Sequence, residues 1–321
     1  MKKIVFMGAD PIALPLLEFL KNSQKEAFSL CGIFSQPDKP VGRGQQIKAN
    51  PISEWAKTNG IPLLTPEKIG DAELTWLRTQ EIDLIIVMAY GHLLKQPLLD
   101  IPPLGAINFH VSLLPKYRGA SPIATVIAEG ESETGVSLMK IVLKMDAGGV
   151  LAQEKVLISP SETTETLSKK LSLATVTLAQ KYLSEVLSGN GTFSEQDDSQ
   201  ASYCRIIHKE DGGLDFSAPA NVLERRIRAL QPWPGAFFDC NEVRIKIKEA
   251  FVMQSVTSTT PGEVVKGANN ALCVATQEGT LCFTKLQRPG GKMLDAESFL
   301  RGFPIPPGEK LMGFPLKPLV R

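Results

Sequence analysis

The sequence predicts an α/β fold, in which a mostly parallel sheet with helices on both faces is followed by a smaller C-terminal β-barrel. Short apolar runs alternate with helical segments through the first half of the chain, which is typical of buried parallel strands. A polar, glycine-containing stretch follows at residues 188–202. Beyond it, short alternating runs are separated by glycine turns, as in small barrels.

The N-terminal elements can be assigned in chain order. Unbroken apolar runs predict strands over residues 3–7, 29–35, 83–88 and 106–110. Helical spacing of apolar residues predicts helices over 12–21, 52–59 and 163–187. A signal peptide is an alternative for the basic, then apolar, start. Gly8, Asp10 and Pro11 interrupt that apolar run, so we expect a strand, a turn and a helix without a presequence.

The C-terminal elements have a different pattern. A helix is predicted over residues 220–230, and strands over 236–238, 243–250, 271–275 and 280–286. We therefore place a catalytic domain at residues 1–189, a linker at 190–208 and a C-terminal β-barrel domain at 209–321.

Composition limits the possible partners and location. The chain has 321 residues and a net charge of +1, which excludes binding of polyanions by the whole surface but not by a local basic patch. No stretch is long and apolar enough for a membrane span. The five cysteines form no Cys-x-x-Cys pair, so we expect reduced thiols, no metal site and a cytoplasmic protein.

The carboxyl ends of the predicted parallel strands should meet at one edge, where ligands of such sheets bind. These ends are Gly8, Gln36, Ala89-Tyr90-Gly91 and His110. A Rossmann-like arrangement of this kind often holds a dinucleotide. The glycine fingerprint for one is missing after the first strand, where Gly8 stands alone.

Asn108 and His110 are the strongest candidates for chemistry at this edge. Residues two apart on a strand share a face, so both side chains should point the same way. An asparagine amide can donate to a developing oxyanion, and a histidine can exchange protons near neutral pH. The alternative is that Asn-x-His is an ordinary strand end whose polar groups are bonded within the protein.

Asp146 is the candidate for a third polar group, at the start of the glycine-rich run Asp146-Ala147-Gly148-Gly149. A carboxylate facing His110 would stabilise the imidazolium and fix its geometry, although Asp-Ala-Gly-Gly alone is usually a turn. Ser112 raises the alternative of a Ser-His-Asp hydrolase. The chain lacks the Gly-x-Ser-x-Gly elbow, and Ser112 lies on the same segment as His110.

An apolar wall is predicted directly after His110. Leu113 and Leu114 stand beside Pro115, whose ring fixes the backbone path. Such a wall suits a flat heteroaromatic ligand.

The run Asn108-x-His110-x-Ser112-Leu113-Leu114-Pro115-x-x-x-Gly119, with Asp146 downstream, resembles the folate-dependent formyltransferase family. Other stretches are similar to members that act on methionyl-tRNA: the loop at residues 36–44, the altered turn Gly8-Ala9-Asp10, and the segments at 228–236 and 287–302. Gly149 departs from the family, which usually has a second aspartate there. The resemblance covers nearly the whole chain.

The resemblance implies a reaction and its participants. A formyl group would pass from 10-formyltetrahydrofolate to the α-amino group of methionine on initiator methionyl-tRNA, for translation initiation. Carried over by position, Asn108 and His110 would stabilise the oxyanion, and Asp146 would pair with His110 and help to deprotonate the amine. The folate site would be lined by Ser112, Leu113, Leu114, Pro115, Ala89 and Tyr90. No metal, membrane or protein partner is implied.

The resemblance also assigns an RNA-binding role to basic residues. Lys39, Arg43 and Lys48 lie in or beside a loop rich in proline and glycine, and a guanidinium such as that of Arg43 can grip a phosphate with two donors. Arg244, Lys246 and Lys248 alternate on a predicted strand and so share one face. That strand belongs to the domain similar to the OB-like barrel of the family. Without the resemblance, both groups would be read as solvated surface.

Two other functions stay open on the sequence. One is a folate-dependent formyltransferase or formylfolate hydrolase that acts on a small-molecule amine or on water. The other is a non-catalytic RNA-binding protein, against which the intact Asn108, His110 and Asp146 speak.

Overall fold

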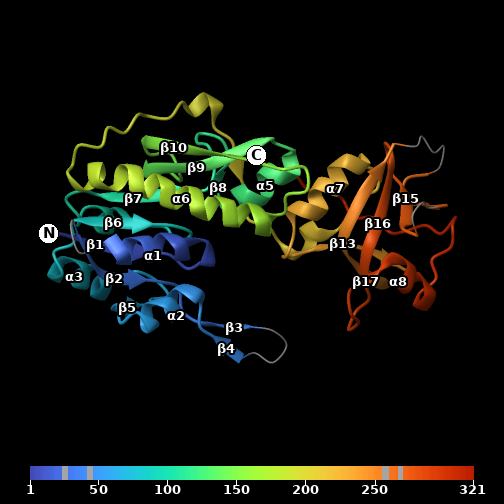
Figure 1. The fold of residues 1–321 in the computed structure, drawn as a ribbon, viewed down its shortest axis with the longest axis horizontal. Helices are drawn as coiled ribbons and strands as arrows, with labels where there is room; N and C mark the ends of the chain where they lie inside the picture. The colour runs from blue at the N-terminus through green and yellow to red at the C-terminus, as the bar shows by residue number, and fades with distance from the viewer. Residues whose placement is uncertain (24–27, 42–45, 255–259, 267–269) are drawn as a thin grey trace. The chain divides into compact units, whose positions relative to one another are not determined.

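A central sheet organises the N-terminal half of the chain (Figure 1). The structure, a computed structural model, describes residues 1–23, 28–41, 46–254, 260–266 and 270–321. The chain divides into two units. The first comprises Met1–Ala120, Glu133–Leu157 and Ser168–Tyr203, and the second comprises Ser121–Ser132, Ile158–Leu167 and Cys204–Arg321.

Among the described residues of the first unit, seven strands form one sheet in the order β10-β9-β7-β6-β1-β2-β5. Strands β5, β2, β1, β6 and β7 run parallel to one another, and β9 is antiparallel to β7 and β10. The strands are β1 (Lys2–Met7), β2 (Phe28–Phe34), β5 (Leu63–Leu64), β6 (Leu84–Val87), β7 (Ala106–His110), β9 (Glu133–Lys140) and β10 (Val150–Leu157). The predicted mostly parallel α/β fold is confirmed, and the β9–β10 hairpin extends it.

Helices connect the parallel strands. They are η1 (Pro11–Ala13), α1 (Leu14–Ser23), α2 (Pro51–Thr58), α3 (Asp71–Thr79) and α4 (Gln96–Leu99). A longer helix, α6 (Thr164–Leu187), follows β10. Helix α2 begins where the Asn50 side chain accepts a hydrogen bond from Ser53 N at 2.9 Å, with Pro51 in the first turn. Short elements complete this part of the chain: β3 (Lys39–Val41), β4 (Gln46–Lys48), β8 (Arg118–Gly119), η2 (Asp198–Gln200) and β11 (Tyr203–Cys204).

The parallel strands end at a common edge, as hydrogen bonds there indicate. Val87 of β6 pairs with Asn108 of β7. Beyond β1, Gly8 N donates to Phe34 O at 3.0 Å and Ala9 N donates to Ala89 O at 3.1 Å. A side chain at Gly8 would come within 2.7 Å of Met88 O. Glycine is therefore needed because the backbones approach closely there.

The second unit contains an antiparallel sheet in the order β12-β13-β16-β15-β14, with β17 paired to β16. This curled sheet is consistent with the predicted OB-like domain. Its elements are α5 (Pro122–Glu129), η3 (Lys209–Gly212), α7 (Ala220–Ala229), β12 (Ala236–Cys240), β13 (Val243–Met253), β14 (Val264–Val265), β15 (Leu272–Ala275), β16 (Thr280–Gln287), β17 (Leu294–Asp295) and α8 (Ala296–Gly302). Strand β13 is three residues longer than predicted at its carboxyl end.

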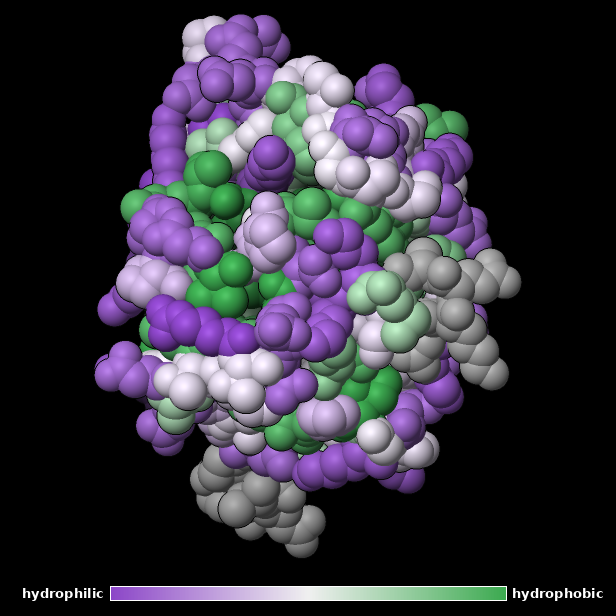
Figure 2. Space-filling view, turned by 90° about the vertical axis from the view of Figure 1, so that its left-hand side faces the viewer, coloured by the Kyte–Doolittle hydropathy of each residue, from purple (hydrophilic) through white to green (hydrophobic). Residues whose placement is uncertain are grey.

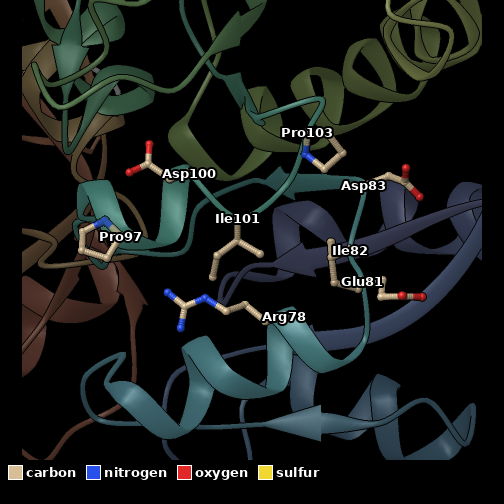
Figure 3. A pocket seen from close by; sticks show the side chains of 8 residues that line it. All are labelled: Arg78, Glu81, Ile82, Asp83, Pro97, Asp100, Ile101 and Pro103. Carbon is tan, nitrogen blue, oxygen red and sulfur yellow. The ribbon is translucent and has the colours of Figure 1, made fainter.

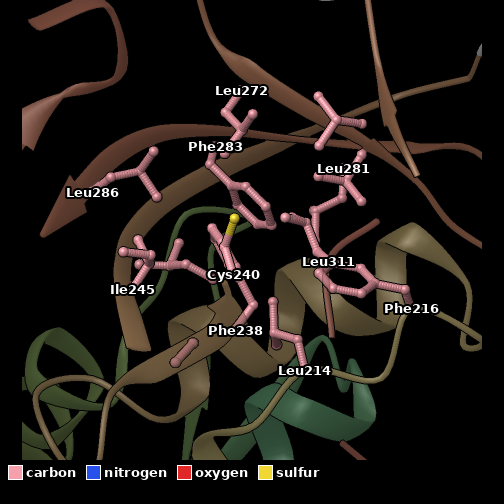
Figure 4. Close-up of a cluster of buried hydrophobic side chains, with 14 of the residues drawn as sticks. Leu214, Phe216, Phe238, Cys240, Ile245, Leu272, Leu281, Phe283, Leu286 and Leu311 are labelled. Atoms are coloured by element: carbon pink, nitrogen blue, oxygen red, sulfur yellow. The ribbon is translucent and has the colours of Figure 1, made fainter. Parts of the chain in front are cut away.

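An apolar core lies beneath this second sheet (Figure 4). The rings of Phe238 and Phe283 stack at 5.4 Å between centroids, and Leu223 and Ile227 of α7 belong to the same cluster. Alternate residues of β13, such as Ile245 and Ile247, point into it. Period-two burial therefore leaves the other face of β13 to polar residues.

Two cysteines of the second unit differ from the expectation of reduced thiols. Cys273 and Cys282 lie directly opposite each other on β15 and β16, with Cα atoms 4.0 Å apart, and form a disulfide. The expectation was wrong because residues nine apart in sequence give no sign of cross-strand register. Cys31, Cys204 and Cys240 are free.

Candidate active site

Strand β7 carries Asn108 and His110 at the carboxyl edge of the first unit's sheet. Asn108 is half-buried and His110 is 6% exposed. Among the described residues, no side chain or backbone group hydrogen-bonds the Asn108 amide. A half-buried amide without a protein partner is open to water or to a ligand. It is therefore a ready donor for a bound oxygen.

His110 has a different partner at each ring nitrogen. Nε2 lies 2.9 Å from Tyr117 O, and Nδ1 lies 3.7 Å from Asp146 Oδ2. A carbonyl oxygen only accepts, so Nε2 carries a proton. In a neutral ring, Nδ1 would then present a lone pair to the carboxylate. A proton on either Nδ1 or Asp146 turns that repulsion into attraction, so the pair is suited to take up and return one proton.

The Asp146 loop is held in a specific conformation. Asp146 has a φ of 48°, in the left-handed region that few non-glycine residues adopt. Its Oδ2 accepts a hydrogen bond from Gly119 N at 2.8 Å. A side chain at Gly148 would lie 2.0 Å from Lys140 O, so this position requires glycine.

Gly149 stands where the family usually has a second aspartate. A Cβ atom at Gly149 would come within 3.0 Å of Phe193 Cβ and 3.2 Å of Ser194 O. The close packing of residues 193–194 thus accounts for the small residue.

The side chains of Ser137 and Gln153 hold the segment after His110, residues 112–115, by hydrogen bonds to its backbone. Leu114 N donates to Ser137 Oγ at 3.0 Å, and Ser137 Oγ donates to Ser112 O at 2.6 Å. Gln153 Nε2 donates to Leu114 O at 2.9 Å. Leu114 and Pro115 are joined by a cis peptide bond.

The predicted folate-lining residues differ in accessibility. Ser112 and Leu114 are buried, and the Ser112 hydroxyl donates to Lys116 O, so both support the segment from inside. Leu113 and Pro115 are half-buried and keep some surface. A ligand can therefore contact the Leu113 and Pro115 side chains and the backbone of this segment.

Ala89 and Tyr90 follow β6 at the same edge. Ala89 is exposed with a φ of 49°. Tyr90 is 2% exposed, and its carbonyl accepts from Gln36 Nε2 at 2.9 Å. Burial, together with the charge of Glu73, raises the pKa of Tyr90 to about 12, so the phenol stays protonated. Its side chain belongs to the core, and Ala89 is the accessible residue of the two.

Comparison with known proteins shows the family to which this chain belongs. The sequence pattern of the formyl transferase family matches residues 1–186, and that of its C-terminal domain matches residues 206–304. The chain belongs to the formyltransferase family. The methionyl-tRNA formyltransferase of Bacillus licheniformis is 38% identical over 97% of this chain and 98% of its own length. That of Trichlorobacter lovleyi is 36% identical over 97% of each chain.

Solved formyltransferases share the fold at lower identity. WlaRD, a sugar 3N-formyl transferase solved with dTDP and 5-N-formyl-THF, aligns with a TM-score of 0.65 at 19% identity, over 90% of this chain and 98% of its own. The N-formyltransferase of Helicobacter canadensis, in complex with folinic acid and dTDP-3-aminofucose, gives a TM-score of 0.65 at 20% identity, over 90% and 100%.

The candidate RNA-binding residues lie in both units. Lys39 of β3 pairs with Lys48 of β4 in a two-stranded ladder, and Arg43 lies outside the described residues. On β13, Arg244, Lys246 and Lys248 all lie on the exposed face.

Arg244 is already engaged within the second unit. It forms an ion pair with Asp239 at 3.0 Å, and its guanidinium lies 3.9 Å from the centroid of the Phe237 ring. The ammonium groups of Lys246 and Lys248 have no ion-pair partner among the described residues. These two are therefore the available cations of the strand.

Two hollows of the first unit lie away from His110. One, of about 470 Å³, lies beside the amino end of β6 and is lined by the charged residues Arg78, Glu81, Asp83 and Asp100 (Figure 3). The side of the molecule near the N-terminus mixes hydrophilic and apolar side chains (Figure 2). No described helix is long and apolar enough to cross a membrane. The described residues contain no cluster of three or more His, Cys, Asp or Glu side chains that could hold a metal ion.

Sequence reasoning missed the residues that support the site. Ser137 and Gln153 lie on the β9–β10 hairpin, and Gln196 lies in the stretch assigned to a linker. Alternation along β9 and β10 was the available signal for the first two. Gln196 gives no signal in the sequence because its role depends on a distant loop.

Proposed function

We propose that the protein transfers a formyl group from 10-formyltetrahydrofolate to the α-amino group of methionine on initiator methionyl-tRNA. The supporting observation is the convergence of the unpartnered Asn108 amide with the His110–Asp146 pair at the carboxyl edge of β7. Relatives named methionyl-tRNA formyltransferase, similar over nearly the full length, support the choice of acceptor.

The side chains have distinct roles in this reaction. The methionine amine attacks the formyl carbon, and the carbonyl oxygen becomes an oxyanion. Asn108 Nδ2 and the Nδ1–H of protonated His110 donate to that oxygen, which stabilises charge that exists only near the transition state. Asp146 accepts the proton lost by the amine, directly or through a water. The C–N10 bond then breaks, and N10 takes a proton as tetrahydrofolate leaves.

The folate would bind along residues 112–115 and Ala89. Leu113 and Pro115 offer apolar contact, and the hydrogen bonds from Ser137 and Gln153 keep the segment in one conformation before binding. Preorganisation of this kind lowers the ordering cost of binding. Formylation of initiator tRNA would place the protein in a bacterial cytoplasm or in an organelle.

The test is formyl transfer from 10-formyltetrahydrofolate to methionyl initiator tRNA, to methionyl elongator tRNA and to free methionine. We expect transfer to the initiator alone. Folate turnover without transfer to any tRNA would instead support a small-molecule formyltransferase or a hydrolase. Absence of any folate binding would leave only an RNA-binding role.

The loop at residues 36–44 provides a second test. Arg43→Ala should slow formylation of charged tRNA at least about tenfold, the loss expected for one charge-assisted phosphate contact, and should leave folate affinity nearly unchanged. Arg78→Ala, in the hollow beside the amino end of β6, is the matched control. An equal loss of folate affinity in Arg43→Ala would contradict an RNA role for the loop.

A further inference from the structure

The stretch between α6 and the second unit is part of the active-site structure. Ser194 pairs with Val150 through two backbone hydrogen bonds of 2.8 and 3.0 Å, and the chain continues past β10 as the yellow trace after α6 (Figure 1). From there, Gln196 Nε2 donates to Asp146 O at 2.8 Å and to Gly148 O at 2.7 Å. One amide thus binds two backbone carbonyls of the loop that presents Asp146.

Arg118 fixes the orientation of that amide. Its Nε and Nη2 donate to Gln196 Oε1 at 3.1 and 2.8 Å. A flipped amide would place its oxygen against two carbonyls and its NH₂ group against a guanidinium, so only one orientation satisfies every group. Nη1 of Arg118 donates to Asp198 Oδ1 at 2.8 Å and to Tyr203 Oη at 3.0 Å.

The burial of Arg118 is unusual for its side chain. Its exposed fraction is 0%, and burying a guanidinium is costly unless its donors are paired. An apolar side chain could fill the space without that cost. The burial of Arg118 is explained by its hydrogen bonds to Gln196, which fix the orientation of the Gln196 amide.

The other partner of His110 is anchored by the same stretch. Tyr117 O lies 2.9 Å from His110 Nε2, and Tyr117 N donates to Ser202 Oγ at 2.9 Å. Tyr117 has a φ of 59°. Both residues that contact the imidazole therefore have left-handed backbones, which must be held by their surroundings, and residues 196–202 hold both.

We infer that Arg118 and Gln196 are positioning residues for the His110–Asp146 pair, with residues 194–203 forming the outer support of the active site. This inference rests on the proposed function for its kinetic readout. Gln196 holds the Asp146 backbone while Gly119 N holds Oδ2. Together they set the 3.7 Å separation from His110 Nδ1, on which proton sharing by the pair depends. Catalysis is sensitive to displacements of about 1 Å in the position of a catalytic group.

Gln196→Glu is the most direct test. The carboxylate keeps its interaction with Arg118 but cannot donate to Asp146 O or Gly148 O. We expect kcat to fall about tenfold or more, with KM for both substrates within about twofold, and the pH profile of kcat to shift. Gln196→Leu, which has similar volume and no polar group, should give the same changes.

The control is Gln180→Glu, the same substitution on the exposed side of α6. The Gln180 side chain has no hydrogen-bond partner among the described residues. This variant should keep the wild-type kcat and pH profile.

A readout without substrate separates this inference from the proposed function. NMR titration of His110, assigned with His110→Ala, should differ between the wild type and Gln196→Glu whichever formyl acceptor the enzyme uses. An unchanged His110 titration with kcat within twofold of wild type would overturn the inference. A lower melting temperature with unchanged kcat and titration would also overturn it, since the role would then be structural.

Discussion

At the residue scale, the site depends on which atom of each side chain is committed elsewhere. The Nε2 atom of His110 is occupied by Tyr117 O, so only Nδ1 is left for the proposed reaction. Asn108 has no competing partner among the described residues. The existing hydrogen bonds of Asn108 and His110, and not their residue types alone, therefore decide which of their atoms are free to bind a substrate.

His110→Ala should lower kcat by about 10²-fold or more, the range for loss of a positioned acid–base group. The variant should stay folded, because the main cost is an unsatisfied Tyr117 carbonyl, of about 1–3 kcal/mol. Steady-state kinetics and a thermal melt measure both effects. His208→Ala, at an exposed histidine, is the control, and a folded variant with near-normal kcat would remove His110 from the mechanism.

At the element scale, a strand end and a hairpin loop supply the site together. Strand β7 carries Asn108 and His110, and the loop between β9 and β10 returns Asp146 to them. The loop can follow that path because Gly148 lies against the carbonyl of Lys140. Loop geometry thus determines the position of the proposed catalytic carboxylate of Asp146.

Gly148→Ala should displace this loop, since the new Cβ atom would lie 2.0 Å from Lys140 O. We expect a loss of stability of about 1–3 kcal/mol, typical of overpacking, and a fall in kcat greater than that loss of stability alone explains. Gly302→Ala, where a Cβ atom meets nothing within 4 Å, should change neither. A normal kcat in Gly148→Ala would show that the Asp146 position is tolerant.

A buried ion pair stabilises the start of the second unit. Asp211 is 5% exposed and accepts from Arg205 at 2.6 and 2.7 Å and from His208 N at 2.7 Å. Burial alone would raise the pKa of Asp211. The hydrogen bonds from Arg205 and His208 and the charges of Arg205 and Arg226 outweigh burial, and the net pKa is lowered.

Because the pKa of Asp211 is lower in the folded than in the unfolded state, its stabilisation is present above about pH 4 and is lost as pH falls through the folded value. Asp211→Asn should destabilise the protein by about 3 kcal/mol at pH 7, since a buried arginine loses its partner. The difference should shrink below about pH 4 in urea unfolding. Asp239→Asn, which breaks the exposed pair with Arg244, should cost less than about 1 kcal/mol. An equal effect at every pH would contradict the ion-pair explanation.

At the scale of the whole molecule, a net charge of +1 requires that RNA binding depend on local cations. Lys246 and Lys248 lie on one exposed face of β13, and Arg244 is neutralised locally by Asp239. The second unit thus offers two available cations where the sequence suggested three.

Affinity for initiator tRNA should fall steeply with salt, because phosphate contacts release counterions. Lys246→Ala and Lys248→Ala should each reduce the slope of log K against log salt by about one, and Arg244→Ala by less. Lys181→Ala, on α6 and paired with Glu154, is the control. A slope unchanged in both lysine variants would exclude this strand as a phosphate contact.

The sequence alone determined the parallel strands, the edge at which they end and the candidate groups Asn108, His110 and Asp146. Apolar runs and period-two alternation are local signals, so strands such as 106–110 could be read directly, and a resemblance spread over nearly the whole chain indicated the family. Tertiary structure decided the rest. The β9–β10 hairpin and the Cys273–Cys282 pairing depend on cross-strand register, and the support of Asp146 by Gln196 and Arg118 depends on contacts between residues far apart in the chain. Local periodicity carries no information about such contacts, because they form only when the chain folds.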